Sequence, residues 1–162
     1  MHQQTKTTLG ISAGTRLVGI AVVRNRQLID WKILQFKERW SREKLKRMLN
    51  KFNQLYDYYR VSTLALKSAD PFRSSPELNA LIGSISLNAR SKRVKVSQYS
   101  LQDLKELSRT KKIRNVEILS EYIVEQYPEL RRVYLRERNN ENRYYVKVFE
   151  AIAAAKLACD SP

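Results

Sequence analysis

Phosphate binding is the chemistry for which this chain carries the most suitable side chains. Lysine and arginine number 31 against 16 aspartates and glutamates, a formal net charge of +15. Such an excess favours a polyanionic partner, because phosphate contacts release the counterions condensed on a nucleic acid. We expect this contact in the stretch 90–114, above all in its acid-free loop 109–114. Against the acids Asp103 and Glu106, the stretch carries Arg90, Lys92, Arg93, Lys95, Lys105, Arg109, Lys111, Lys112 and Arg114.

The side chains of the common catalytic sites are scarce. The sole histidine, His2, stands at the polar start of the chain, which leaves no histidine cluster for a metal and no histidine base. Cys159 has no histidine partner for nucleophilic work, and a lone cysteine favours a reducing cytoplasm. Four glycines allow no glycine-rich phosphate loop. We therefore expect no cofactor.

The elements that position these residues begin with strands. Segments 9–11, 17–23 and 28–36 indicate three strands, with turns at Gly14-Thr15 and Arg24-Asn25. Their alternation is weak, so the sheet should be covered on much of both faces. Segments 61–66 and 94–99 indicate two further strands.

Helices should alternate with the later strands. A helix from about Ser41 carries an apolar stripe, and its cations Lys44, Lys46, Arg47 and Lys51 are expected on the opposite face. Capping residues predict further helices from Ser75-Pro76, from Ser100 with Asp103, and from Asn115 as far as Pro128. Segment 131–143 is charged and low in periodicity, so we expect it to be irregular. An alanine-rich helix over 146–159 follows.

The opening hairpin carries a family resemblance. Residues 8–22 read TLGISAGTRLVGIAV, which resembles the Gly-Ile-Asp-x-Gly-Thr hairpin of RuvC-type Holliday-junction resolvases and their YqgF relatives. Segment 94–99, then Leu104-Lys105, then KVFEAIA in the last helix follow the resolvase order at similar spacing. The resemblance implies a ribonuclease-H-like α/β fold in a single domain over 1–162. Its five-stranded mixed sheet would have strands 1–3 antiparallel and strands 4 and 5 parallel, flanked by helices.

The resemblance also locates the catalytic positions of the family, where four acids hold two metal ions that activate water. These positions correspond to Ser12, Lys67, Lys147 and Glu150, so that only the last keeps its carboxylate. One carboxylate beside two ammonium groups is a poor site for Mg²⁺. We therefore expect a catalytically inactive domain that binds structured nucleic acid, with branched DNA favoured over RNA. Lys67 and Lys147 would contact phosphate, or would pair with Glu150 or water and do nothing more.

Two other functions remain open. One is a metal-dependent endonuclease, of resolvase or ribosomal-RNA-processing type, with a Mg²⁺ or Mn²⁺ site rebuilt around Glu150 and Asp70. Asp70 is more simply a turn residue before Pro71, and Asp30 an exposed strand position. The other is a protein-interaction scaffold with little affinity for nucleic acid.

Further surfaces could support binding. Phe72, in the loop after the fourth strand, is either a stacking wedge or part of a packed loop. Segment 131–147 interleaves arginines with Tyr134, Tyr144 and Tyr145, which either stack on bases or, as we favour slightly, anchor the segment to the core. Resolvases act as homodimers, so self-association is expected by resemblance. No apolar run approaches the roughly 20 residues that cross a bilayer, so we expect no membrane contact.

Overall fold

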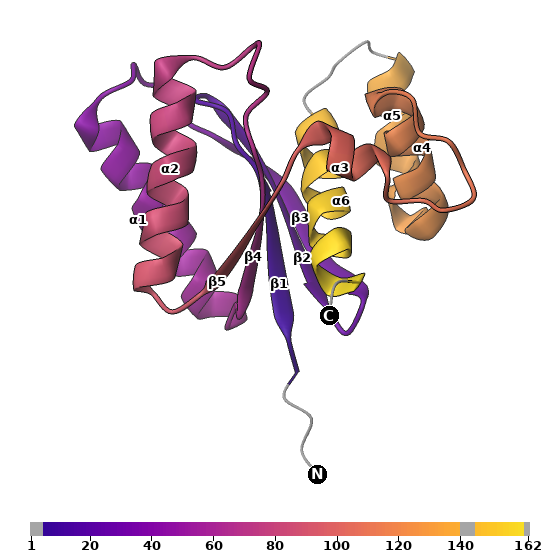
Figure 1. The fold of residues 1–162 in the computed structure, drawn as a ribbon, viewed down its shortest axis with the longest axis horizontal. Helices are drawn as coiled ribbons and strands as arrows, with labels where there is room; N and C mark the ends of the chain where they lie inside the picture. Colours follow the sequence, from indigo (N-terminus) through magenta and orange to yellow (C-terminus); the bar gives the residue numbers. More distant parts are fainter. Residues whose placement is uncertain (1–4, 140–144, 161–162) are drawn as a thin grey trace.

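One mixed sheet forms the centre of the molecule. The computed structural model describes residues 5–139 and 145–160. The strands lie in the order β3-β2-β1-β4-β5, with β1–β3 antiparallel and β1, β4 and β5 parallel (Figure 1). This arrangement confirms the predicted sheet. The strands are β1 (Thr7–Ser12), β2 (Leu17–Arg24), β3 (Gln27–Gln35), β4 (Thr63–Lys67) and β5 (Lys95–Tyr99).

Helices cover both faces of this sheet. In Figure 1, α1 and α2 lie on one side and α6 on the other, with α4 and α5 packed beyond α6. The helices are α1 (Arg42–Tyr59), α2 (Pro76–Ser91), α3 (Leu101–Lys105), α4 (Val116–Gln126), α5 (Arg131–Asn139) and α6 (Val146–Asp160), with a 3-10 turn η1 (Pro128–Leu130). None of the described helices is both long enough and apolar enough to span a bilayer.

The two faces of the sheet differ in the size of their side chains. Leu9 and Ile11 of β1 pack towards α1 and α2, where Phe52 is fully buried. Strand residues alternate between faces, so the neighbouring Gly10 faces α6. Ala21 of β2 and Ala65 of β4 belong to the cluster around α6 as well. The part of this face where α6 crosses β1, β2 and β4 is therefore built largely from small residues.

These small residues let α6 lie close to the strands. A Cβ added at Gly10 would overlap the carbonyl of Ala151, and one at Gly19 would overlap the backbone at Lys147. Ala153, Ala154 and Ala155 of α6 are also fully buried. Glycine is needed at both strand positions because a helix backbone occupies the space of a side chain.

Four predicted helix starts are confirmed. The side chains of Ser41, Ser75, Ser100 and Asn115 each accept a hydrogen bond from a backbone N–H three residues on. Asp103 completes a capping box by accepting from the N–H of Ser100 at 2.8 Å. These caps satisfy donors that the first helical turn leaves without partners.

Lys44 does not lie on the solvent face predicted for it. Its ammonium donates to the carbonyls of Phe36 at 3.0 Å and Glu38 at 2.7 Å, and only 1% of the residue is exposed. Burial lowers the pKa of Lys44, while the nearby Glu38 raises it and Arg16 lowers it. The long lysine stem reaches back to the turn that leads into α1, so the charge is satisfied by carbonyls there.

Other local predictions also need correction. The β2–β3 turn is Asn25-Arg26, one residue later than expected, because Arg24 still pairs with Gln27. Asp30 is not simply exposed, since its carboxylate accepts hydrogen bonds from the Tyr59 hydroxyl and the Trp31 N–H.

Segment 131–139 is a helix rather than irregular. Its inward positions are Val133, Tyr134 and Glu137, and Leu130 precedes them at helical spacing. A buried glutamate in the last of these positions breaks the apolar pattern that predicts a helix.

Substitution of two glycines by alanine tests the close approach of α6, because only one of the two lies against that helix. Gly10→Ala should lower the free energy of unfolding by about 2 to 3 kcal/mol, because the added methyl meets backbone that cannot rotate away. Gly83→Ala in α2 is the matched control, since nothing lies within 4 Å of its Cβ position. It should raise stability by about 0.5 to 1 kcal/mol through helix propensity. Chemical denaturation of both variants measures the difference, and equal effects would contradict the packing described here.

Candidate functional site

The four positions identified by resemblance meet at one end of the sheet. Ser12 ends β1, Lys67 ends β4, and Lys147 and Glu150 lie in the first turns of α6. Strands β1 and β4 are parallel neighbours, so their carboxyl ends lie side by side. The close packing of α6 on Gly19, which pairs with Ser12, brings the start of the helix to the same edge.

Glu150 is the centre of this cluster, and both of its oxygens have partners. The Ser12 hydroxyl donates to Oε1 at 3.2 Å, and the Lys67 ammonium lies 2.9 Å from Oε2. The side chain of Glu150 is only 7% exposed and that of Lys67 19% exposed. A carboxylate buried to this degree requires a compensating charge, and Lys67 supplies it.

Lys147 is held by the β1–β2 turn rather than by Glu150. Its ammonium donates to the carbonyl of Ala13 at 3.4 Å, and its last carbons pack where Gly14 has no side chain. Burial lowers the pKa of Lys147, Glu150 raises it, and the nearby Lys67 lowers it. The cluster therefore carries two ammonium groups against one carboxylate.

These residues do not fit the divalent metal that the family resemblance implies. Magnesium takes hard oxygen ligands, usually carboxylates together with phosphate and water. Here the one carboxylate already binds an ammonium, and a second ammonium adds repulsion. Asp70, the other acid considered, accepts the Phe72 N–H at 2.9 Å in an exposed turn, as predicted. Within residues 5–139 and 145–160, no three His, Cys, Asp or Glu side chains are grouped as a metal would require.

The loop 109–114 connects α3 to α4, and Asn115 at its end links it to the cluster. The loop follows α3 at the carboxyl end of β5 and leads to Asn115, which lines the same cavity as Lys147 and Glu150. Ile113 is buried and anchors the loop, and Lys111 pairs with Glu125 at 3.1 Å. Lys105, at the end of α3, is half-buried. The fully exposed cations of the loop are Arg109, Lys112 and Arg114.

The stretch 90–114 is not one surface in space. Strand β5 divides it, because Arg90, Lys92 and Arg93 precede the strand while Lys105 and the loop 109–114 follow it. The first group therefore lies at the amino end of the parallel strands, away from the cluster (Figure 1). Residues that are close in the sequence lie far apart in space here, because a strand carries the chain across the sheet.

Phe72 projects into solvent beside the cluster. It lies in the loop that follows Lys67, and 95% of it is exposed, which excludes the packed-loop alternative. Arg73, next to it, and Arg16, in the β1–β2 connection, are exposed cations at the same end of the sheet. Neither arginine was predicted as a site residue, although both lie in connections that follow predicted strands.

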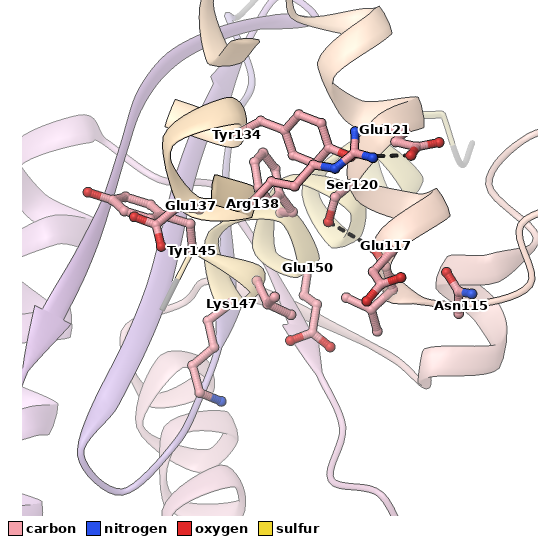
Figure 2. A pocket seen from close by; sticks show the side chains of 13 residues that line it. Asn115, Glu117, Ser120, Glu121, Tyr134, Glu137, Arg138, Tyr145, Lys147 and Glu150 are labelled. Carbon is pink, nitrogen blue, oxygen red and sulfur yellow. Dashed lines mark hydrogen bonds between the residues drawn. The ribbon is translucent and has the colours of Figure 1, made fainter. Parts of the chain in front are cut away.

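A cavity of about 890 Å³ opens between α4, α5 and α6 and reaches the cluster. Figure 2 shows Lys147 and Glu150 extending from α6 at its edge, and Glu117 and Asn115 on the α4 side. Glu137 is buried, one of its oxygens has no hydrogen-bond partner among the described residues, and burial raises its pKa. This cavity was not predicted from the sequence, because α5, which forms one wall, was expected to be irregular.

The two described tyrosines of segment 131–147 make contacts within the protein. Tyr134 packs edge-on against Phe149 and donates to Glu121 at 3.3 Å, which supports an anchoring role. Tyr145 accepts a hydrogen bond from Arg136 at 3.0 Å, with the guanidinium over its ring. Arg143, Tyr144 and the sole histidine, His2, lie outside the described residues.

The ion pair in the cluster predicts a non-additive effect on stability. Lys67→Met should lower the free energy of unfolding by about 2 to 3 kcal/mol, because it leaves the Glu150 carboxylate buried without its counter-charge. Adding Glu150→Gln, which keeps an acceptor for Ser12, should restore stability to within about 1 kcal/mol. Urea denaturation of the two single variants and the double variant measures this cycle. Additive losses would show that the two side chains do not act as a pair.

Solved structures with a similar fold provide a comparison for this geometry. No protein-family model and no curated protein sequence matches the chain. Thermus thermophilus RuvC superposes with a TM-score of 0.67 at 14% identity, over 93% of this chain and 91% of that one. The same protein in complex with Holliday junction substrate gives 0.62 at 13% identity, over 93% and 90%. The Fowlpox virus resolvase in complex with Holliday junction DNA gives 0.55 at 11% identity, over 96% and 99%. The chain therefore has the ribonuclease-H-like fold of the RuvC-type resolvases.

Proposed function

We propose that this chain is a non-cleaving RuvC-like domain that binds the phosphate backbone of structured nucleic acid at the carboxyl end of β1 and β4. Branched DNA is the first ligand to test, because two of the similar structures hold Holliday junctions. The observation that carries the proposal is the Lys67–Glu150 pair. It puts an ammonium where the resemblance expects a metal, so backbone could be held there without being cut.

The charges around the pair support binding at the rim of the site. Arg109, Lys112 and Arg114 are exposed in the loop that leads to Asn115, and Arg16 and Arg73 are exposed in the connections that follow β1 and β4. The cavity itself is lined by more acids than cations, so it does not attract phosphate: Glu117, Glu121, Glu137 and Glu150 against Arg138 and Lys147. A backbone would therefore cross the basic rim rather than enter the cavity. Phe72 would lie beside it, free to stack on an unpaired base.

The first experiment is one titration. Labelled four-way junction, duplex DNA and stem-loop RNA are mixed with the protein at two salt concentrations, with and without Mg²⁺ or Mn²⁺, and the strands are examined on a denaturing gel. Metal-independent, salt-sensitive binding with uncut strands is the expected result. Metal-dependent cleavage would establish the endonuclease alternative instead. No binding at physiological salt would leave the protein-interaction scaffold.

Removing the three exposed cations of the loop should weaken binding. Arg109→Gln/Lys112→Gln/Arg114→Gln should reduce junction affinity by about 10- to 100-fold and lower the slope of log affinity against log salt by about 2 to 3. The matched control, Lys46→Gln/Arg47→Gln/Lys51→Gln, removes the same charge from α1, which covers the face of the sheet opposite α6. Lys67 is left intact because its loss would also unfold the site. Equal losses in both variants would mean that net charge alone drives binding.

The pKa of Lys147 predicts that binding and stability respond to pH in opposite directions. That pKa is lowered in the folded chain, so Lys147 loses its proton at a lower pH in the folded state than in the unfolded state. Between the lowered pKa and the ordinary lysine value of 10.5, the unfolded state therefore holds more protons than the folded state. The Lys147 contribution to stability should therefore increase over that range, while its contribution to phosphate binding falls. Lys147→Arg, which stays charged, should lose both changes. Thermal melts and binding titrations over this pH range measure them, and parallel curves for the two proteins would exclude a role for Lys147.

A further inference from the structure

A second group of cations lies at the opposite end of the sheet. Lys6 precedes β1, Arg26 is in the β2–β3 turn, and Arg60 follows α1. The register joins this edge into one row, because Lys95 pairs with Thr63, Thr63 with Thr8, and Arg24 with Thr7. Arg24 also donates to the carbonyl of Tyr59 at 3.1 Å, which ties the end of α1 to the row. The basal surface consists of Lys6, Arg26, Arg60, Lys92, Arg93 and Lys95 (lower end of Figure 1).

The positive charge of the basal surface is largely uncompensated. All six side chains belong to exposed residues, and none forms an ion pair within the described part of the chain. Four acids lie near this end, and one of them, Asp30, accepts a hydrogen bond from Tyr59. Asp57 is in the last turn of α1, Glu129 shares a shallow hollow with Arg26, and Asp160 pairs with Lys156 at 3.8 Å.

Three of the six residues hold a backbone conformation that glycine adopts more easily. Arg26, Arg60 and Arg93 have φ angles of 62°, 52° and 63°. Asn25, with φ 54°, is the remaining case in the described residues, and none of the four glycines has positive φ. Glycine is the usual residue at such turns and helix ends because it has no Cβ to strain. Arginine at all three positions therefore favours a role for the side chain rather than for the turn.

We propose that the basal surface is a second binding site for the phosphodiester backbone of double-stranded nucleic acid, so that one chain can hold two backbone segments. Five strands span about 19 Å, which exceeds the roughly 12 Å width of a major groove. Cations at the two ends of the row therefore reach phosphates on both sides of one groove. This site uses none of the residues in the proposed function, so either proposal can fail alone.

The structure favours nucleic acid over an anionic membrane as the occupant. Membrane binding by an amphipathic helix places the apolar face of the helix in the headgroup region, below its cations. Here the cations come from separate connections: the start of β1, the β2–β3 turn, and the segments after α1 and α2. Tyr58, exposed beside Arg60, is instead placed to contact a base or sugar.

The test uses glycine, which removes the charge and suits the left-handed backbone. Arg26→Gly/Arg60→Gly/Arg93→Gly is compared with the wild type and with the α1 control variant. Native mass spectrometry with a 12-base-pair duplex DNA counts the duplexes bound per chain. Two per chain are expected for the wild type and control, and one for the glycine variant. Its salt slope for a longer duplex should fall by about 2 to 3, and its melting temperature should stay the same or rise.

A second variant keeps the proposal testable if the glycines disturb the turns. Lys6→Gln/Lys92→Gln/Lys95→Gln leaves every left-handed residue in place and should also bind one duplex per chain. The loop variant of Arg109, Lys112 and Arg114 should lose the other duplex, and its failure to do so would count against the proposed function alone. One duplex per wild-type chain would overturn the second site. So would vesicles of phosphatidylcholine and phosphatidylserine that bind only through the basal surface, with duplex binding unchanged.

Discussion

The close approach of α6 to the sheet is the constraint on which the rest of this structure depends. Gly10 and Gly19 leave room for the helix backbone, and the buried alanines of α6 fill the remaining space without holding it away. This contact fixes how far the first turn of α6 lies from the ends of β1 and β4. Ser12, Lys67 and Glu150 can then meet although they come from distant parts of the chain.

The charge in the cluster follows from that geometry. A carboxylate held at the edge of a packed core must bind a cation or take up a proton. Glu150 is in this position, and an ammonium from the end of β4 satisfies it, so no bound ion is needed for its neutrality. Lys147 then adds a positive charge that no carboxylate in the cluster pairs with directly. At the positions where the family resemblance implies metal-binding carboxylates, this chain has the ammonium groups of Lys67 and Lys147.

The sequence was sufficient to predict the five strands, most of the helices and four helix starts, because these depend on local patterns. The mixed sheet was predicted through the resemblance to resolvases. The sequence also placed Ser12, Lys67, Lys147 and Glu150 together, through resemblance to resolvases. It failed where distant contacts decide the outcome. Lys44 is buried because carbonyls of a neighbouring turn accept hydrogen bonds from its ammonium. Glu137 occupies an inward position of α5, so the helix lacks the apolar pattern by which it could be predicted. The basic stretch 90–114 lies on two separate surfaces because β5 runs through it. The left-handed backbone conformation of Arg26, Arg60 and Arg93 has no signal in the sequence.

The hydrogen bond between Ser12 and Glu150 joins residues 138 apart in the sequence. The central strand β1 precedes the other strands in the chain, whereas α6, which covers one of its faces, follows all five of them. Contacts of such long range form slowly and cannot form before both partners have been made. Until α6 has been synthesised, the small-residue face of the sheet stays uncovered and the cluster does not exist. Any binding that depends on the cluster therefore requires α6 to be in place.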